Sequence, residues 1–335
     1  MKKKLLTILL CVCMAGIILM GCGNGAYDTV EEADVIEEGL TAEKYFKLAV
    51  SYQDGDGVVQ DYAKAVVCYE KAMEMGNGLA AGNLAYLYRN GCGVEQDYAK
   101  AVECYERGVA LGDGVSANNL GYLYDVGEGV EQDYEKAITY YELGVEYGNC
   151  QAAGNLAYLY RYGYGVERDI DKAVEYYMIG VDLGHGVSAN NLGYMYDMGE
   201  EIEQNYELAV FYYEKGIEMG EGTSAGNLAR LYRYGYGVER DYAKAVANYQ
   251  IAVSMKNAAA ANSLGYMYLY GEGVKQDYEK AADYYVQAIE LGNGASAYSL
   301  GYMYFLGLGV EADEDKAREW YTYSLECGYD YDWYQ

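Results

Sequence analysis

The sequence predicts an all-α protein, a right-handed α-solenoid of eight helix-turn-helix repeats that are 36 residues long. Three observations predict it: a glycine and valine turn motif recurs every 36 residues without insertion or deletion, apolar positions follow helical spacing, and none of the 335 residues is proline. One helix pair of this length cannot bury its apolar face alone, so neighbouring units must stack. The stack is a scaffold by geometry.

The turn motif reads G-x-G-V, and its eight copies set the repeat length. Its last position is Val58, Val94, Val130, Val166, Ile202, Val238, Val274 and Val310. Its first is Gly55, Gly91, Gly127, Gly163, Gly199, Gly235, Gly271 and Gly307. The same interval separates tyrosines that we predict to be core: Tyr69, Tyr105, Tyr141, Tyr177, Tyr213, Tyr249, Tyr285 and Tyr321.

Two helices are predicted within each unit. In the second unit the first helix covers roughly residues 80–89, where a buried stripe is spaced i, i+3, i+4 and i+7: Ala81, Leu84, Ala85 and Tyr88. The glycines of the turn end this helix and allow a left-handed conformation. Asp97 is the predicted N-cap of the second helix, which carries the buried stripe Ala101, Tyr105 and Val109.

These motifs resemble the Sel1-like repeat, a relative of the tetratricopeptide repeat, over residues 41–328. The resemblance implies a scaffold or adaptor protein. The departures from the motif are few: Glu201, Asn205 and Leu208 replace a turn glycine, the capping aspartate and a lysine in the fifth unit, and Lys256 replaces a terminal glycine in the sixth. We therefore expect the fifth unit to pack or cap differently.

The first 21 residues read as a secretory signal rather than as part of the fold. Lys2, Lys3 and Lys4 precede an apolar run over residues 5–20. The run ends in Gly21-Cys22, which resembles a bacterial lipoprotein signal and implies cleavage followed by acylation of Cys22, for example with palmitate. An uncleaved anchor or an ordinary signal peptide is the alternative. Either way, an extracytoplasmic place in the cell envelope is expected, with lipid anchoring to a membrane.

Residues 22–40 follow as a flexible acidic tether, because small residues are followed by six acids without any Lys or Arg. At the other end, residues 329–335 form an aromatic and acidic tail after a unit in which Phe305, Leu306 and Leu308 replace charged turn residues. A last repeat needs a cap, and the tail folding back over this apolar end is one interpretation. Contact with a partner or another subunit is the other.

Three columns of the first helices are predicted to face outward. With Leu84 as the core direction and about 100° per residue, the positions two before, two after and five after lie opposite the core. The middle column is a tyrosine ladder interrupted once: Tyr86, Tyr122, Tyr158, Tyr194, Arg230, Tyr266 and Tyr302. The third alternates in charge and is expected to form a ladder of ion pairs between neighbours: Arg89, Asp125, Arg161, Asp197 and Arg233. By contrast, we predict that the Tyr88 column is core.

The two outward columns are the candidate ligand-binding residues. Arg161-Tyr162-Gly163-Tyr164-Gly165 recurs 72 residues later as Arg233-Tyr234-Gly235-Tyr236-Gly237, so the surface follows a doubled period. Tyrosine offers rigid amphipathic contacts and arginine offers anchors, which favours binding of a protein or peptide on the concave face. A periodic but inert face, or a glycan of the cell wall or host stacked on the tyrosines, is the alternative.

Several chemistries find no support in the sequence. A formal charge of −28 argues against nucleic acid as a partner. His185 is the one histidine and stands at a turn, so neither a histidine triad nor a two-histidine metal site can be assembled. No S-x-x-K motif occurs, so we expect no enzyme, cofactor or metal, although cysteine-rich relatives make a β-lactam-binding activity a remote alternative.

Cysteine usage predicts mostly free, buried thiols. Five cysteines follow Cys22, and no unit holds a regular pair: Cys68, Cys92, Cys104, Cys150 and Cys327. Cys68 and Cys104 occupy equivalent positions of adjacent units, about 8–10 Å apart, which is beyond the reach of an unstrained disulfide.

Overall fold

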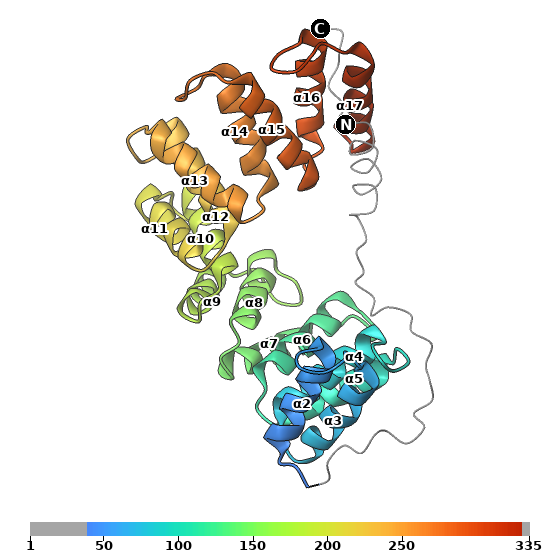
Figure 1. Ribbon diagram of the computed structural model, residues 1–335. Coiled ribbons are helices and arrows are strands. Elements are labelled where there is room, and N and C mark those ends of the chain that lie inside the picture. The colour runs from blue at the N-terminus through green and yellow to red at the C-terminus, as the bar shows by residue number, and fades with distance from the viewer. Residues whose placement is uncertain (1–38, 330–335) are drawn as a thin grey trace. The chain divides into compact units, whose positions relative to one another are not determined.

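The computed structural model describes residues 39–329, and within that range it contains sixteen helices and no strand (Figure 1). The predicted signal peptide, most of the tether and the last six residues lie outside the described residues. The helices group into two compact units, residues 39–185 and residues 186–329, with four repeats in each. Each repeat is a pair of helices, so the predicted all-α repeat architecture is confirmed.

The helices of the first unit are α2 (Ala42–Asp54), α3 (Tyr62–Glu74), α4 (Gly78–Asn90), α5 (Tyr98–Ala110), α6 (Gly114–Val126), α7 (Tyr134–Glu146), α8 (Cys150–Tyr162) and α9 (Ile170–Asp182). Those of the second unit are α10 (Gly186–Met198), α11 (Tyr206–Glu218), α12 (Gly222–Tyr234), α13 (Tyr242–Ser254), α14 (Ala258–Tyr270), α15 (Tyr278–Glu290), α16 (Ala295–Leu306) and α17 (Glu314–Glu326). The helix predicted over residues 80–89 is therefore real but longer at its start.

Local sequence explains where these helices begin and end. Asp97 caps α5 as predicted, because its side chain accepts the backbone N–H of Lys100 at 3.0 Å. The first helix of each repeat ends at a glycine with a left-handed backbone; Gly91, for example, has φ 68°. A helix of 13 residues is marginal by itself in water, so packing between helices must stabilise it.

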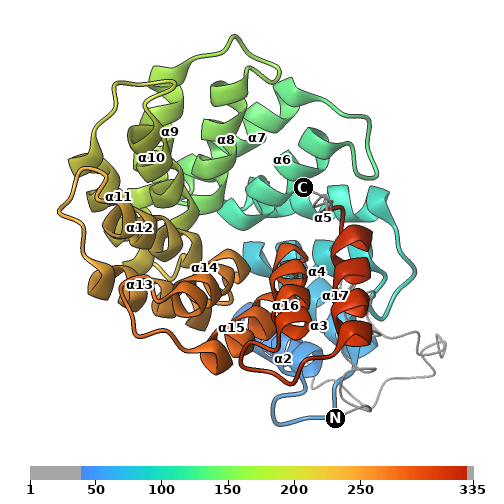
Figure 2. The ribbon, with the colours of Figure 1, turned by 90° about the horizontal axis from the view of Figure 1, so that it is seen from above.

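Neighbouring helices pack in a regular order within each unit. The two helices of a repeat pair closely, as α4 does with α5, and the second helix also contacts the first helix of the next repeat, as α5 does with α6. First helices of adjacent repeats also touch, as α4 and α6 do. Figure 2 shows the same side-by-side order for α14, α15 and α16 in the second unit.

The predicted tyrosine core is confirmed for one column and only partly for the other. All eight tyrosines of the Tyr69 column are buried. The Tyr69 hydroxyl donates to Oε1 of Gln53 at 2.9 Å and accepts from Nδ2 of Asn83 at 3.1 Å, so its polar end is satisfied inside the repeat. The Tyr88 column is mostly half-buried instead; the Tyr88 hydroxyl reaches Oε1 of Glu70 at 3.1 Å at the surface.

The irregular fifth repeat differs in its turn but not in its cap. Asn205 still caps α11, since its side chain accepts the backbone N–H of Leu208 at 3.0 Å. The turn is tighter: a Cβ on Gly199 would lie 2.5 Å from Cβ of Gln204, against 3.3 Å for the equivalent Gly91 and Gln96. In the sixth repeat, Lys256 adopts the left-handed φ of 63° that its aligned position demands.

Candidate functional site

The predicted outward tyrosines do face solvent. We call these six side chains, one per repeat, the tyrosine face, and each is 38–47 % exposed: Tyr86, Tyr122, Tyr158, Tyr194, Tyr266 and Tyr302. The neighbours on either side along each helix are buried, as Ala85 and Leu87 are around Tyr86. The helix therefore holds each ring outward on a rigid support, with three members in each of the two units.

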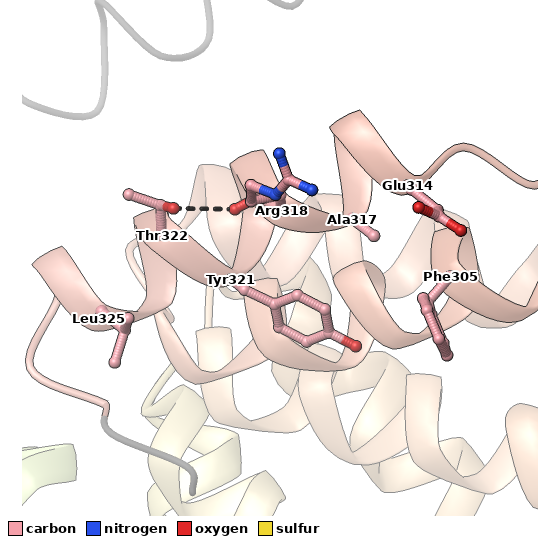
Figure 3. A pocket seen from close by; sticks show the side chains of 7 residues that line it. All are labelled: Phe305, Glu314, Ala317, Arg318, Tyr321, Thr322 and Leu325. Carbon is pink, nitrogen blue, oxygen red and sulfur yellow. Dashed lines mark hydrogen bonds between the residues drawn. The ribbon is translucent and has the colours of Figure 1, made fainter. Parts of the chain in front are cut away.

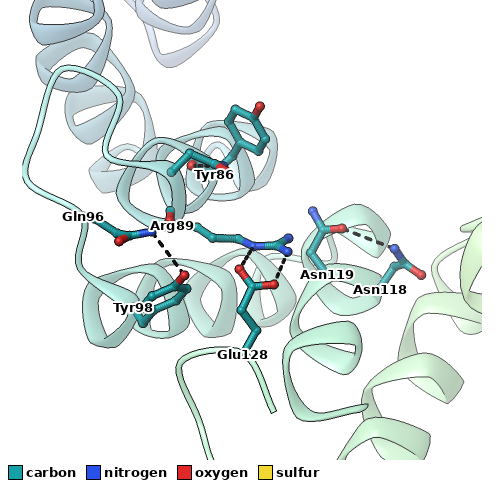
Figure 4. Close-up of polar contacts among 8 residues, drawn as sticks. Tyr86, Arg89, Gln96, Tyr98, Asn118, Asn119 and Glu128 are labelled. Carbon is teal, nitrogen blue, oxygen red and sulfur yellow. Dashed lines mark hydrogen bonds and ion pairs between the residues drawn. The ribbon is translucent and has the colours of Figure 1, made fainter. Parts of the chain in front are cut away.

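An arginine of one repeat holds the tyrosine of the next in the first unit. Arg89 forms two parallel hydrogen bonds to Glu128, from Nε to Oε1 at 2.9 Å and from Nη2 to Oε2 at 2.5 Å (Figure 4). Its guanidinium lies 5.2 Å from the ring centroid of Tyr122. One cation thus joins the turn acid and the exposed ring of the following repeat, whereas Tyr86 points away from the pair.

The second unit repeats this arrangement at the positions 144 residues later. Arg233 pairs with Glu272, with Nε 3.0 Å from Oε1, and lies 5.0 Å from the ring centroid of Tyr266. It is also 5.1 Å from the centroid of Tyr234 and only 7 % exposed. A buried guanidinium with a bidentate carboxylate is a link between repeats rather than a group available to a partner.

The acidic members of the charged column turn toward the core. Asp125 accepts the hydroxyl proton of Tyr141 at 3.1 Å, and Asp197 accepts that of Tyr213 at 3.0 Å. Asp197 is 2 % exposed and pairs in addition with Arg230. Burial raises the pKa of Asp125, and the bond from Tyr141 partly opposes this.

The expected outward ladder of alternating charges is therefore wrong in two respects. Arg89 pairs with Glu128 rather than with Asp125, and both Asp197 and Arg233 are buried. The angle that placed this column opposite the core treats the helix as touching one neighbour. In the fold, a first helix packs against its own second helix and against the next repeat, which cover this side of it.

The remaining predicted site residues are partly exposed. Arg161 is half-buried, with its guanidinium 5.3 Å from the ring centroid of Tyr162. Arg230 occupies the one non-tyrosine position of the middle column, and its side chain lies 5.9 Å from the centroid of Tyr236 while it pairs with Asp197. The predicted lipidation residue, Cys22, lies outside the described residues.

Exposed rings beside the tyrosine face were missing from the candidate residues. Tyr158 has Tyr162 and Tyr164 as neighbours, with ring centroids 4.6 Å and 6.0 Å away, and all three are exposed. In the second unit, Tyr234 and Tyr236 stack 5.7 Å apart. The duplicated Arg-Tyr-Gly-Tyr-Gly segment was the signal that could have identified them.

The column two positions before the tyrosines also links repeats. Asn118 accepts from Nδ2 of Asn155 in the next repeat at 3.0 Å, and Asn190 accepts from Asn227 in the same way at 3.0 Å. At Gly82 a Cβ would meet Asp113 and Ser116 of the next repeat at 2.8 Å. These positions set the spacing between repeats, which leaves the tyrosines as the members of the outward surface that are free to bind.

The cysteines follow the prediction in part. Cys68, Cys104, Cys150 and Cys327 are free thiols, and Cys68, Cys92 and Cys104 are buried. Burial raises the pKa of Cys68 to about 11 and that of Cys104 to about 12, so both stay protonated at neutral pH. The prediction of buried thiols is wrong for Cys327, which is exposed because it ends the last helix, and Cys150 is half-buried.

The described residues were also searched for other kinds of site. No helix among residues 39–329 is both long and apolar enough to traverse a bilayer. In the same range, no three or more His, Cys, Asp or Glu side chains gather in a way that could hold a metal ion.

Comparison with known proteins identifies the repeat. The family model described as "Sel1 repeat" matches eight successive segments: residues 45–77, 78–113, 114–149, 150–185, 186–221, 224–257, 258–293 and 294–329. These segments coincide with the eight helix pairs. A comparison with curated proteins finds no significant match.

Two solved structures show the same architecture. One is c5321, described as a protective antigen present in uropathogenic Escherichia coli strains that displays an SLR fold; it is 32 % identical with a TM-score of 0.68, and the match covers 85 % of this chain and 63 % of that one. The chain thus spans less than two thirds of that antigen. The other is a Sel1 repeat protein from Oxalobacter formigenes, 27 % identical with a TM-score of 0.64, covering 76 % of this chain and 99 % of that one.

Proposed function

Because the chain belongs to the Sel1 repeat family, whose members are generally non-catalytic protein-interaction scaffolds, we propose that it is an envelope scaffold that binds a protein or peptide along its tyrosine face. One observation carries the proposal: a column of exposed tyrosine rings, one per repeat, stands on buried helices. Rings cost more to leave in water than polar side chains do, so their regular exposure favours a partner.

The chemistry of the face suits a polypeptide. Each tyrosine offers an apolar ring and a hydroxyl while losing little side-chain entropy on binding. The nearby arginines are already paired with acids, Arg89 with Glu128 and Arg233 with Glu272. The surface therefore offers no strong cationic anchor, and a mixed apolar and hydrogen-bonding segment fits it better than a polyanion does.

The place of the scaffold is proposed from the sequence. Residues 1–21 would be removed as a lipoprotein signal, and acylation of Cys22 would hold residues 22–40 as a tether at the membrane. Labelling of growing cells with radioactive palmitate tests this: the chain should carry label, and Cys22→Ala should abolish it. Label that survives Cys22→Ala would reject the anchor.

Binding is tested with the full chain purified in mild detergent and immobilised. We expect envelope proteins to be retained, and Tyr122→Ala combined with Tyr158→Ala to reduce retention at least tenfold, since loss of two interface tyrosines costs several kcal/mol. The matched control combines Tyr147→Ala with Met178→Ala, which are about equally exposed but lie outside the tyrosine face. Equal loss in both double variants, or no loss in the first, contradicts the proposal.

A glycan is the second candidate, because the exposed rings of Tyr158, Tyr162 and Tyr164 form a local aromatic cluster of the kind that stacks on sugars. Purified wall polysaccharide on the same column separates the two. Retention of polysaccharide that Tyr162→Ala abolishes, without retention of protein, would favour it.

A further inference from the structure

The last repeat carries an open pocket that none of the proposed functions uses. It has a volume of about 460 Å³ and lies along α17 and the end of α16 (Figure 3). Its lining is Phe305, Glu314, Ala317, Arg318, Tyr321, Thr322 and Leu325. Apolar side chains form most of it, and Arg318 is its one basic group.

The pocket occupies the face on which a further repeat would stack. Each lining residue has an equivalent 36 positions earlier, where the next repeat covers it. Leu269 is 4 % exposed while its equivalent Phe305 is 47 % exposed, and Ile289 is 1 % exposed while Leu325 is 50 % exposed. Burial of two such side chains is worth about 1.5–3 kcal/mol each, so the open face is a cost that an occupant would remove.

The chain itself supplies a segment that can reach this face. Six residues follow Tyr329, and they read Asp330-Tyr331-Asp332-Trp333-Tyr334-Gln335. The backbone N–H of Tyr329 donates to the carbonyl of Ser324 at 3.0 Å, so the segment starts beside Leu325 at one end of the pocket. From there the helix runs about 16 Å back to Glu314. Six extended residues span up to about 20 Å, which matches that length.

The composition of the segment complements the pocket. In an extended chain alternate residues face the same way, so Tyr331 and Trp333 can both face the apolar wall. Asp330, Asp332 and the terminal carboxylate then lie toward the rim, where Arg318 is exposed. Glu314 is the one acid in the lining, and it lies at the far end. Covalent attachment gives the segment an effective concentration in the millimolar range, which a second copy would have to match.

We propose that residues 330–335 lie along this pocket and cap the last repeat, with Trp333 against Phe305 and Tyr331 against Leu325. The cap takes the place of a further repeat. It also closes the end of the stack against association with other helical proteins.

Trp333 provides the measurement, because Trp320 is the only other tryptophan. In the full chain with Trp320→Phe, purified in mild detergent, we expect blue-shifted emission from Trp333 and an acrylamide quenching constant several-fold below that of free tryptophan. Phe305→Gln combined with Leu325→Gln should restore solvent-like emission and quenching. The matched control is Phe211→Gln combined with Leu79→Gln, which removes equally exposed side chains elsewhere and should leave Trp333 shielded.

Because Trp320 is buried and its replacement can unfold the chain, a second measurement leaves it in place. Labelling with 5-fluorotryptophan gives two fluorine resonances, and Trp333→Phe assigns the one from the tail. Shielding of that resonance from solvent, lost in the pocket variant alone, supports the cap. A solvent-exposed Trp333, shielding that the pocket variant does not alter, or shielding that disappears on dilution and so comes from a second copy, would overturn it.

Discussion

At the scale of single residues, charged side chains of the first helices join one repeat to the next. Arg89 reaches across to Glu128, and the same contact recurs between Arg233 and Glu272. Each guanidinium also lies against a ring of the tyrosine face. The charge pattern that suggested a recognition surface is thus mainly a stabilising device, and it positions the tyrosines that remain exposed.

The Arg89 and Glu128 pair should make stability depend on pH. The hydrogen bond from Arg89 lowers the pKa of Glu128 below its ordinary value of 4.5, although partial burial opposes the effect. A lowered folded-state pKa contributes stability that is present above about pH 4.5 and is lost as the pH falls through the lowered value. Arg89→Met should therefore cost about 1 kcal/mol at pH 7 and progressively less below pH 4.5, as measured by urea unfolding.

Arg107→Met provides the comparison, because Arg107 is exposed on α5 and an item of surface rather than of an ion pair between repeats. It should show no such pH-dependent difference from the unmodified chain. A deficit of Arg89→Met that stays constant from pH 7 to pH 3 would show that the ion pair is not its cause.

At the scale of the helices, small residues decide how closely neighbours approach. Gly121 of α6 faces the ring of Tyr141, where an added Cβ would lie 2.8 Å from Cδ1 and 3.2 Å from the carbonyl oxygen of Ala137. Gly226 of α12 has the same helical setting, but the nearest atom to its added Cβ is 3.8 Å away. Two helical glycines are therefore present for different reasons.

Alanine at these two positions should change stability in opposite directions. Gly121→Ala forces a methyl group against a buried ring and should destabilise the chain by about 1–3 kcal/mol. Gly226→Ala meets open space and should stabilise it by about 0.5–1 kcal/mol, because glycine is a poor helix former. Urea midpoints with unchanged slopes provide the measurement; a loss of stability in both variants would refute the packing argument for Gly121.

Lys256 occupies a helix end where the other repeats have glycine. Its φ of 63° costs a side-chain-bearing residue about 1–2 kcal/mol, which glycine does not pay. Lys256→Gly should raise the urea midpoint, by up to about 1 kcal/mol in free energy once the freer unfolded chain is counted. The reciprocal change Gly112→Lys, at a φ of 80°, should lower it, and the idea fails if the two variants shift the midpoint in the same direction.

At the scale of the whole molecule, repetition and charge set the behaviour. The chain carries a formal charge of −28, which falls to −31 if Lys2, Lys3 and Lys4 leave with the signal, and this excess of acid repels itself in the folded state. The ion pairs between repeats act in the opposite sense but are few.

Salt should therefore stabilise the protein. Raising sodium chloride from about 10 mM to 1 M shortens the screening length from about 30 Å to 3 Å. We expect the thermal midpoint to rise over this range, with potassium chloride giving the same result and sucrose at equal osmolality a smaller one. A midpoint that falls with salt would mean that the ion pairs outweigh the repulsion.

Much of this architecture could be predicted because each repeat carries its own instructions. Asp97 caps a helix, Gly91 ends one, and Tyr105 is buried, all as their local sequence context indicates. The outward direction of Tyr86 follows from helical geometry alone. Repetition strengthens each of these predictions, since the same pattern is read eight times.

The sequence by itself thus determined the helices, their turns, the number of repeats and the exposed tyrosine column, because these depend on local backbone preferences and on one helix's own periodicity. Only the tertiary structure decided that Asp197 and Arg233 are buried, that Arg89 binds Glu128, and that Tyr162 and Tyr164 join Tyr158 in an exposed cluster. These features depend on which neighbour covers which side of a helix. That is set by packing between elements 30 or more residues apart.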